Sequence, residues 1–171
     1  MFDNVTPSAA KQAYRVVDWR MKVLVLFGTR PEVIKLAPVI HELRKKFFQT
    51  IVVSSSQHKQ LLVPFLEALE VDVDFDLGVM KRNQTPTDVV SRILSKLDKI
   101  LASEKPDLIL VQGDTTTTLA GALAGFYRRI PVGHVEAGLR SGNLMSPFPE
   151  EMNRRVVSQI ASFHFAATEK N

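Results

Sequence analysis

Short, unbroken apolar runs recur along this chain, and each is followed by a polar turn and then by a helical pattern. The clearest runs lie within residues 23–27, 50–54, 107–111 and 130–136. A strand that is buried on both faces has such a run, whereas a half-exposed strand alternates between apolar and polar residues. Strands that alternate with helices at this spacing predict an α/β fold with a doubly wound parallel sheet.

The other elements follow from residue spacing and from proline. Helices are expected at residues 33–47, 57–69, 116–127 and 149–162, and short strands near residue 75 and at 164–167. Pro38 predicts a kink in the first helix. A further helix is expected after Thr85, a candidate N-cap that is followed by Pro86 in the first turn and by an apolar stripe at helical spacing.

The composition is that of an ordinary globular domain. The 171 residues are enough for one domain with a full core, and 45 % of them are apolar. We interpret residues 1–20 as an N-terminal extension that lacks the apolar segment of a signal peptide, and residues 21–171 as the domain. No apolar run approaches the ~20 residues of a membrane span. We therefore expect a cytoplasmic protein with no membrane partner.

Cysteine content and charge restrict the chemistry further. The sequence contains no cysteine, which excludes disulfides, thiolate metal sites and a cysteine nucleophile. Its net charge of +4 is modest, and no basic run with interleaved aromatic residues is present. We therefore expect no nucleic acid partner, whereas the charge suits an anionic small molecule.

The segment from residue 134 to residue 155 concentrates charge between a predicted strand and a predicted helix. It carries two carboxylates, Glu136 and Glu150, and two arginines, Arg140 and Arg154. Glycines and prolines between them exclude a regular element. Ligands bind outside the carboxyl ends of the strands in open parallel sheets, and loops on a rigid scaffold often carry function. We interpret this segment as a functional site.

The turn after the first strand, Gly28-Thr29-Arg30, lies where this kind of fold handles phosphate. It is not a dinucleotide fingerprint, because Gly28 stands alone and no acidic residue ends the second strand. Arg30 on this loop and Lys35 one turn into the helix are two cations near a helix N-terminus. That pair suits a pyrophosphate, although both residues are also consistent with solvated surface charges.

Asp114 follows the strand at residues 107–111. It is either a functional carboxylate or only the N-cap of the next helix, and its spacing does not decide between the two. Together with Glu136 and Glu150 it makes three carboxylates near two cations, a set that suits proton transfer beside a phosphorylated leaving group. His134 and Glu136 alternate along one strand and so share a face, but no third ligand is evident, and we expect no metal.

Five segments of the chain resemble motifs of one enzyme family, the non-hydrolysing UDP-N-acetylglucosamine 2-epimerases. They are FGTRPEVIK at residues 27–35, QH at 57–58, QGDTTTT at 112–118, HVEAGLR at 134–140 and PFPEEMNR at 147–154. The resemblance covers residues 21–171, and the last two motifs together are highly specific. It implies that the chain is the first of two Rossmann-like domains that face a cleft, the glycosyltransferase-B arrangement, without the second.

The resemblance also implies a reaction. The family interconverts UDP-GlcNAc and UDP-ManNAc without NAD or a metal, so no cofactor is expected. The C2 proton is removed and UDP is expelled anti to give 2-acetamidoglucal, and UDP then re-adds with a proton delivered to the other face of C2. The complete protein is expected to be a homodimer that serves cell-surface polysaccharide synthesis. This chain alone lacks the family's second-domain histidine and is expected to be inactive.

The matched motifs imply roles for several individual residues. Arg30 and Lys35 would contact the phosphates of UDP. Asp114, Glu136 and Glu150 would form the acid/base set, without an assignment of any one of them to a face of C2.

The remaining implied residues concern substrate support and regulation. Arg154 would support the substrate or a carboxylate, and Arg140 would also belong to the substrate site. Gln57 and Gln60 match a region that binds a second, activating UDP-GlcNAc in some bacterial members. A basic residue that regulated members use nearby falls on Asn83, which leaves regulation open.

Two other functions remain compatible with the sequence. A UDP-sugar glycosyltransferase of the same architecture would need an acceptor site, which the sequence does not reveal. A UDP-sugar-binding module without catalysis would fit the short length of the chain.

Overall fold

The computed structural model describes residues 21–46, 48–56 and 59–171, with the backbone alone at residues 59–61. The expected N-terminal extension lies outside the described residues. The strands are β1 Lys22–Phe27, β2 Gln49–Ser54, β3 Phe75–Asp76, β4 Leu108–Gln112, β5 Val132–Ala137 and β6 Phe163–Ala166. The helices are α1 Arg30–Lys45, α2 Lys59–Ala68, α3 Pro86–Glu104, α4 Thr116–Tyr127 and α5 Glu150–Ile160.

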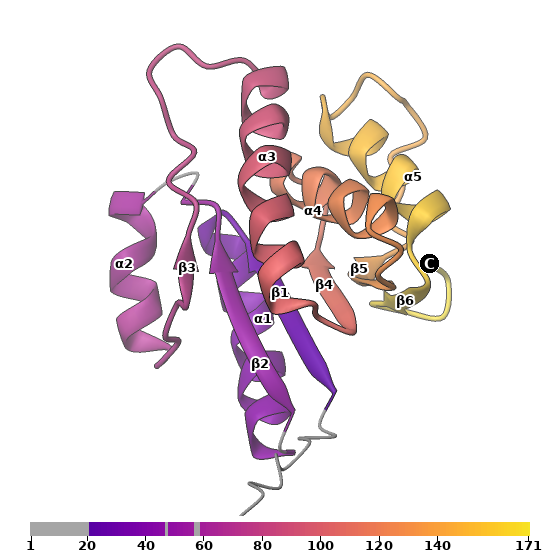
Figure 1. Ribbon diagram of the computed structural model, residues 1–171. Coiled ribbons are helices and arrows are strands. Elements are labelled where there is room, and N and C mark those ends of the chain that lie inside the picture. Colours follow the sequence, from indigo (N-terminus) through magenta and orange to yellow (C-terminus); the bar gives the residue numbers. More distant parts are fainter. Residues whose placement is uncertain (1–20, 47, 57–58) are drawn as a thin grey trace, which may run out of the picture.

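The strands form one parallel sheet in the spatial order β3-β2-β1-β4-β5-β6 (Figure 1). The chain builds outward from β1 through β2 to β3, and then returns to the other side of β1 with β4, β5 and β6. This confirms the predicted doubly wound, Rossmann-like sheet. It also places the topological switch point between β1 and β4, where sheets of this kind bind ligands.

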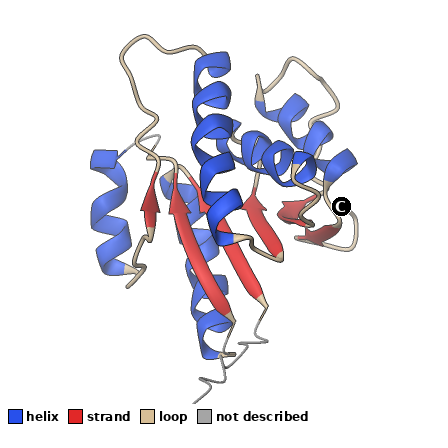
Figure 2. Ribbon diagram, viewed as in Figure 1, coloured by secondary structure: helices blue, strands red, loops and turns tan. Residues whose placement is uncertain are grey.

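Helices cover both faces of the sheet (Figure 2). The side chains of β1 divide between the two layers: Leu24 and Leu26 pack in the core with α3 and α4, and Val23 and Val25 pack in the core with α1. Both faces of this strand are therefore dry, which explains its unbroken apolar run. No helix in the described ranges is both long and apolar enough to cross a membrane.

Helix α1 begins earlier than the sequence predicted. It starts at Arg30 rather than at residue 33, and Pro38 lies inside it. The reason is a capping box: Thr29 is the N-cap, and its backbone N–H donates to the carboxylate of Glu32, three residues further on. Arg30 is therefore the first residue of the helix, where the prediction had placed it on the preceding loop.

The starts of α3 and α4 settle two expectations. Helix α3 begins at Pro86 after the N-cap Thr85, as predicted. The N-cap of α4 is Thr115, whose hydroxyl accepts from the backbone N–H of Thr118 at 3.1 Å. The interpretation of Asp114 as an N-cap is therefore wrong, because Asp114 stands one residue before the cap.

Strand β5 is irregular near its carboxyl end. Its register against β6 shifts between Val135 and Ala137, and Glu136 between them has φ of 60°. A residue with a β-carbon rarely adopts this left-handed conformation, and such backbone strain gathers at functional sites. The shift interrupts the alternation from which His134 and Glu136 were expected to share one face.

Candidate active site

Three of the predicted residues meet at the carboxyl edge of the sheet, beside the switch point. Lys35 comes from α1, Asp114 from the turn between β4 and α4, and Glu136 from β5. The ammonium of Lys35 lies 2.5 Å from one oxygen of Glu136, and the amide of Gln112 donates to the other at 2.7 Å. Glu136 is thus held from two elements that precede it by many residues.

Arg154 of α5 joins the two carboxylates. Its Nη2 donates to Asp114 Oδ2 at 2.6 Å and lies 3.6 Å from Glu136 Oε2, and its Nη1 donates to the backbone carbonyl of Glu136. The side chain of Arg154 is 5 % exposed, against 34 % for Asp114 and 23 % for Glu136. The guanidinium of Arg154 is therefore buried, whereas the two carboxylates that it contacts are partly exposed. Its planar fork of N–H donors can contact both acidic residues at once, which the single ammonium of a lysine cannot do.

Glu150, the third predicted carboxylate, lies apart from this network. It is the first residue of α5 and lines a neighbouring cavity of about 380 Å³ together with Thr29, Thr115, Thr116 and other residues. Its Oε2 is buried and has no hydrogen-bond partner among the described residues. Glu150 thus lines a cavity and has one buried carboxylate oxygen without a partner among the described residues.

Asn153 connects the cavity to the charge network. It lines the same cavity as Glu150, and its side-chain amide donates to the backbone carbonyl of Asp114 at 2.8 Å. Helix α5 therefore holds Asp114 at two points, through Asn153 on the backbone and Arg154 on the carboxylate. The cavity and the network are two parts of one continuous site.

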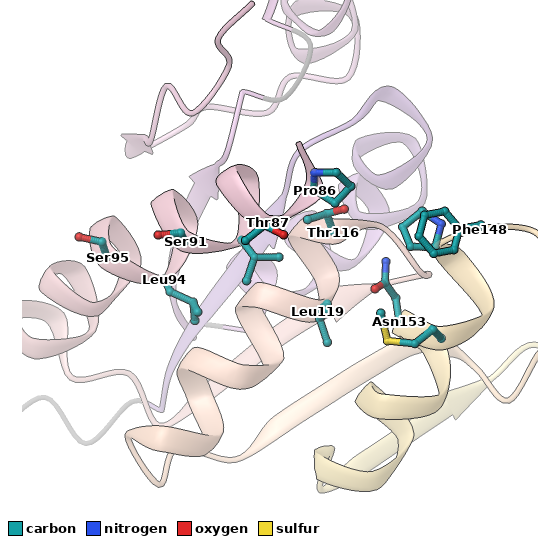
Figure 3. Close-up of a pocket in the computed structure, with 12 residues that line it drawn as sticks. Pro86, Thr87, Ser91, Leu94, Ser95, Thr116, Leu119, Phe148 and Asn153 are labelled. Carbon is teal, nitrogen blue, oxygen red and sulfur yellow. The ribbon is translucent and has the colours of Figure 1, made fainter. Parts of the chain in front are cut away.

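A second, mostly apolar cavity of about 800 Å³ adjoins this site between α3, α4 and α5. Leu94 of α3, Leu119 of α4 and Phe148 line it (Figure 3). It shares Thr116 and Asn153 with the cavity that contains Glu150. The apolar cavity therefore adjoins the cavity that Glu150 lines.

The two remaining predicted arginines do not join the network. Arg30 is exposed, and its guanidinium carbon lies 5.2 Å from the ring centroid of Phe65, an arrangement that favours a cation–π contact. Arg140 is also exposed and donates to Leu139 O and to the hydroxyl of Ser158. Arg30 lies at the N-terminus of α1, where the phosphate was expected, and Arg140 contacts α5 through Ser158.

Gln57 lies outside the described residues, and only the backbone of Gln60 is described, in α2.

Sequence reasoning missed three residues that the structure places at the site. Gln112 ends an apolar run, and an amide at the end of a buried strand was the available signal. Glu32 is 1 % exposed and has a signal in the Thr-x-x-Glu spacing of a capping box. Asn153 gave no signal, because its contact with Asp114 depends on how α5 packs.

His134 forms a hydrogen bond with the turn that precedes Asp114. Its Nε2 lies 2.7 Å from the carbonyl of Gly113, so this nitrogen carries the proton and donates. The side chain is fully buried, Nδ1 has no partner among the described residues, and burial lowers the pKa of His134. A neutral imidazole therefore fixes the turn that precedes Asp114. The described part of the chain contains no cluster of three or more His, Asp or Glu side chains able to hold a metal.

Comparison with known proteins decides the family. Residues 41–171 match the family model described as UDP-N-acetylglucosamine 2-epimerase. The chain belongs to this family. The matched range contains Asp114, Glu136, Glu150 and Arg154, whereas the β1–α1 turn lies outside it.

Curated members of the epimerase family are close to this chain in sequence. A UDP-N-acetylglucosamine 2-epimerase of Yersinia pestis is 52 % identical over 152 residues, which are 88 % of this chain and 40 % of that protein. One of Escherichia coli K12 is 53 % identical over 150 residues, 87 % of this chain and 40 % of that protein. The chain therefore spans about 40 % of the length of the curated relatives it matches.

Solved structures of epimerases in this family share the fold. The Neisseria meningitidis enzyme, bound to UDP-GlcNAc, superposes with a TM-score of 0.85 at 52 % identity, over 88 % of this chain and 41 % of that one. The Methanocaldococcus jannaschii enzyme, in complex with UDP-GlcNAc and UDP, gives 0.83 at 39 % identity over 88 % and 41 %. Acinetobacter baumannii MurG, at 16 % identity and a TM-score of 0.66, shares the fold alone.

Proposed function

We propose that this chain supplies the acid/base residues of a non-hydrolysing UDP-GlcNAc 2-epimerase, which interconverts UDP-GlcNAc and UDP-ManNAc. One observation carries the proposal: Asp114 and Glu136 are held by the shared, buried Arg154, with Lys35 against Glu136, at the carboxyl edge of the sheet. The relatives with UDP-GlcNAc bound support the substrate.

The proposed reaction moves protons on both faces of C2. In the first step the C2–H bond breaks, its proton goes to an enzyme group, and the C1–O bond breaks so that UDP leaves from 2-acetamidoglucal. In the second step UDP re-forms the C1–O bond while a proton reaches the opposite face of C2. Acids on different elements suit proton transfer at two faces, because Asp114 and Glu136 lie in the Arg154 network and Glu150 lies in the cavity beside it.

The nucleotide phosphates are the next part of the proposal. Lys35 and Arg30 both lie in the first two turns of α1. We assign the UDP phosphates to these two side chains, because cations near a helix N-terminus suit a diphosphate. Lys35 then links the leaving group to the acid that it touches, Glu136.

The rest of the catalytic site is proposed to come from a second domain. The chain covers about 40 % of relatives such as the Yersinia pestis epimerase, and its acids lie at an open edge rather than inside a closed cleft. On the family resemblance we propose that residues 21–171 form the first of two domains, and that the two-domain protein is a cytoplasmic homodimer without a cofactor. Arg140 and the region of Gln57 and Gln60 remain proposed substrate and regulatory positions.

A joined enzyme tests the proposed reaction. Residues 21–171 are fused to the part of the Yersinia pestis relative that this chain does not cover, and the product is incubated with UDP-GlcNAc in deuterium oxide. Proton NMR should show deuterium at C2 in both UDP-ManNAc and recovered UDP-GlcNAc. Epimerised product that retains hydrogen at C2 would contradict the acid/base scheme, and net sugar transfer to an acceptor would favour a glycosyltransferase.

A further inference from the structure

Glu32 is a buried carboxylate that the proposed reaction does not use. It is 1 % exposed, and no Lys, Arg or His among the described residues forms an ion pair with it. Burying a carboxylate is costly unless other groups satisfy it, and burial raises the pKa of Glu32. A buried carboxylate at this position therefore needs hydrogen bonds that compensate for the cost of its burial.

The hydrogen bonds of Glu32 come from two separate loops. Its Oε2 accepts from the backbone N–H of Gly28 at 2.9 Å and from the N–H and hydroxyl of Thr29, each at 2.7 Å. Its Oε1 accepts from the hydroxyl of Thr115 at 2.7 Å, with the hydroxyl of Thr118 at 3.2 Å. One carboxylate thus ties the β1–α1 turn to the N-terminus of α4.

A helix cap alone does not account for this arrangement, as α3 demonstrates. There Asp88 makes the same kind of capping box with Thr85, accepting from its N–H at 2.9 Å and its hydroxyl at 2.8 Å. An aspartate is therefore long enough to cap a helix whose N-cap is threonine. The additional methylene of Glu32 extends its carboxylate to a residue 83 positions further along the chain.

The two joined loops carry different parts of the proposed site. The β1–α1 turn leads directly into Arg30, and Thr115 directly follows Asp114. Asn153 and Arg154 of α5 hold Asp114 by hydrogen bonds. Glu32 of α1 holds the same turn through the hydroxyl of Thr115. Because Glu32 also occupies the N–H groups of Gly28 and Thr29, an incoming phosphate must be bound by side chains rather than by these amides.

We propose that Glu32 is a positioning residue, whose carboxylate fixes the distance between the phosphate-binding start of α1 and the turn that carries Asp114. It acts through Thr115 and touches neither the sugar nor the phosphate. The effect on turnover rests on the proposed function, whereas the link between the two loops does not.

Glu32→Asp is the diagnostic variant, and Asp88→Glu is its matched control. In Glu32→Asp the shorter side chain keeps the charge and the cap of α1 but loses the reach to Thr115. Glu32→Gln keeps the length, because its oxygen can accept from the fixed N–H groups while its NH₂ donates to the Thr115 oxygen. A positioning role therefore predicts that Asp is the more damaging replacement, whereas a role for the charge itself predicts the opposite order.

The first measurement uses the chain itself and needs no activity. Hydrogen exchange, read by NMR, should be faster at the Thr118 amide in Glu32→Asp and nearly unchanged at Thr29. Asp88→Glu should leave both amides unchanged. Faster exchange confined to the start of α1 would show that Glu32 is only a cap, and would overturn the proposal.

The second measurement uses the joined enzyme at a temperature where circular dichroism shows each variant folded. Glu32→Asp should lower kcat by about 10- to 100-fold with KM changed much less, the scale of a misplaced catalytic group. Glu32→Gln should lose less, and Asp88→Glu should stay within about twofold. An unchanged kcat in Glu32→Asp, or a larger loss in Glu32→Gln, overturns the proposal. Absence of C2 exchange in the unmodified joined enzyme would instead refute the proposed function, and hydrogen exchange would still decide the link.

Discussion

The buried guanidinium of Arg154 lies 2.6 Å from the partly exposed carboxylate of Asp114. The same side chain donates to the backbone carbonyl of Glu136, the residue with the left-handed backbone at the end of β5. Arg154 therefore fixes one acid by its charge and the strained turn of the other by a hydrogen bond. Helix α5 acts as the clamp that sets the two acids relative to each other.

Arg154→Lys should break this clamp while keeping its charge. A single ammonium cannot hold Asp114 and the carbonyl of Glu136 in the fork geometry of a guanidinium. We expect a loss of about 1.5–3 kcal/mol in unfolding free energy, the scale of a hydrogen bond to a charged group. Urea denaturation of the chain measures it. Arg128→Lys, at an exposed ion pair with Asp98, should cost about 0–1 kcal/mol, and an equal loss in both variants would remove the special role of Arg154.

The three carboxylates should each be needed for turnover. In the joined enzyme, Asp114→Asn, Glu136→Gln and Glu150→Gln should lower kcat by at least ~10²-fold, the usual scale for an acid/base group. Affinity for UDP-GlcNAc should change by less than about tenfold, because the proton-transfer step is what each group serves. Steady-state rates and calorimetric titration give the two quantities. Asp98→Asn, at an exposed ion pair with Arg128, is the control, and a comparable loss there would point to general damage.

Arg30→Ala should act on binding rather than on the chemical step. Its guanidinium is exposed at the first position of α1, where it can meet a phosphate. Loss of a charged hydrogen bond should weaken UDP binding to the joined enzyme by about 1.5–3 kcal/mol. Arg44→Ala, at the other end of the same helix, provides the control for isothermal titration. Equal affinities for UDP in the two variants would remove Arg30 from the phosphate site.

The buried His134 should make stability depend on pH. Burial lowers the pKa of His134 in the folded chain, so the unfolded chain binds more protons as the pH falls through its ordinary value of 6.5. The unfolding free energy should therefore decrease from about pH 7.5 to about pH 5.5. Glu32, whose pKa is raised, contributes with the opposite sign, so the comparison must be with a His134 variant.

His134→Gln supplies that comparison, since its amide can still donate to the carbonyl of Gly113. The packing change lowers its stability at every pH, and values at pH 8 normalise for this loss. The fall in stability below pH 7 should be smaller in His134→Gln than in the unmodified chain. Parallel denaturation profiles over this range would show that His134 does not cause the dependence.

The sequence predicted the sheet because its signals are local. The apolar run of β1 reports burial on both faces, and Thr85 with Asp88 reports the start of α3. The meeting of Asp114 and Glu136 was also predictable, because neighbouring parallel strands end at the same edge. These inferences need only periodicity, caps and strand order.

The rest of the site depends on packing that no local pattern reports. The contact of Arg154 with Asp114 spans 40 positions and requires the angle at which α5 crosses the sheet edge. The left-handed backbone of Glu136 has no glycine or asparagine to signal it. The separation of Glu150 from the other acids likewise follows from the position of the first turn of α5. Two signals were visible in the sequence and overlooked: the capping pair Thr29 and Glu32 at the start of α1, and the amide of Gln112 at the end of β4.

The last prediction concerns this chain by itself. We expect residues 1–171 to bind UDP-GlcNAc weakly and not to epimerise it. Asp114 is 34 % and Glu136 is 23 % exposed, so both acids face water, where a charge interaction at ~4 Å is worth only about 1 kcal/mol. Removal of the C2 proton needs groups that are closely positioned in a site that excludes water. Proton NMR of the purified chain with UDP-GlcNAc follows UDP-ManNAc directly, with the joined enzyme as the positive control. If the chain alone turned over UDP-GlcNAc at a rate near that of the joined enzyme, a second domain would not be needed for catalysis. That result would refute this view of the site.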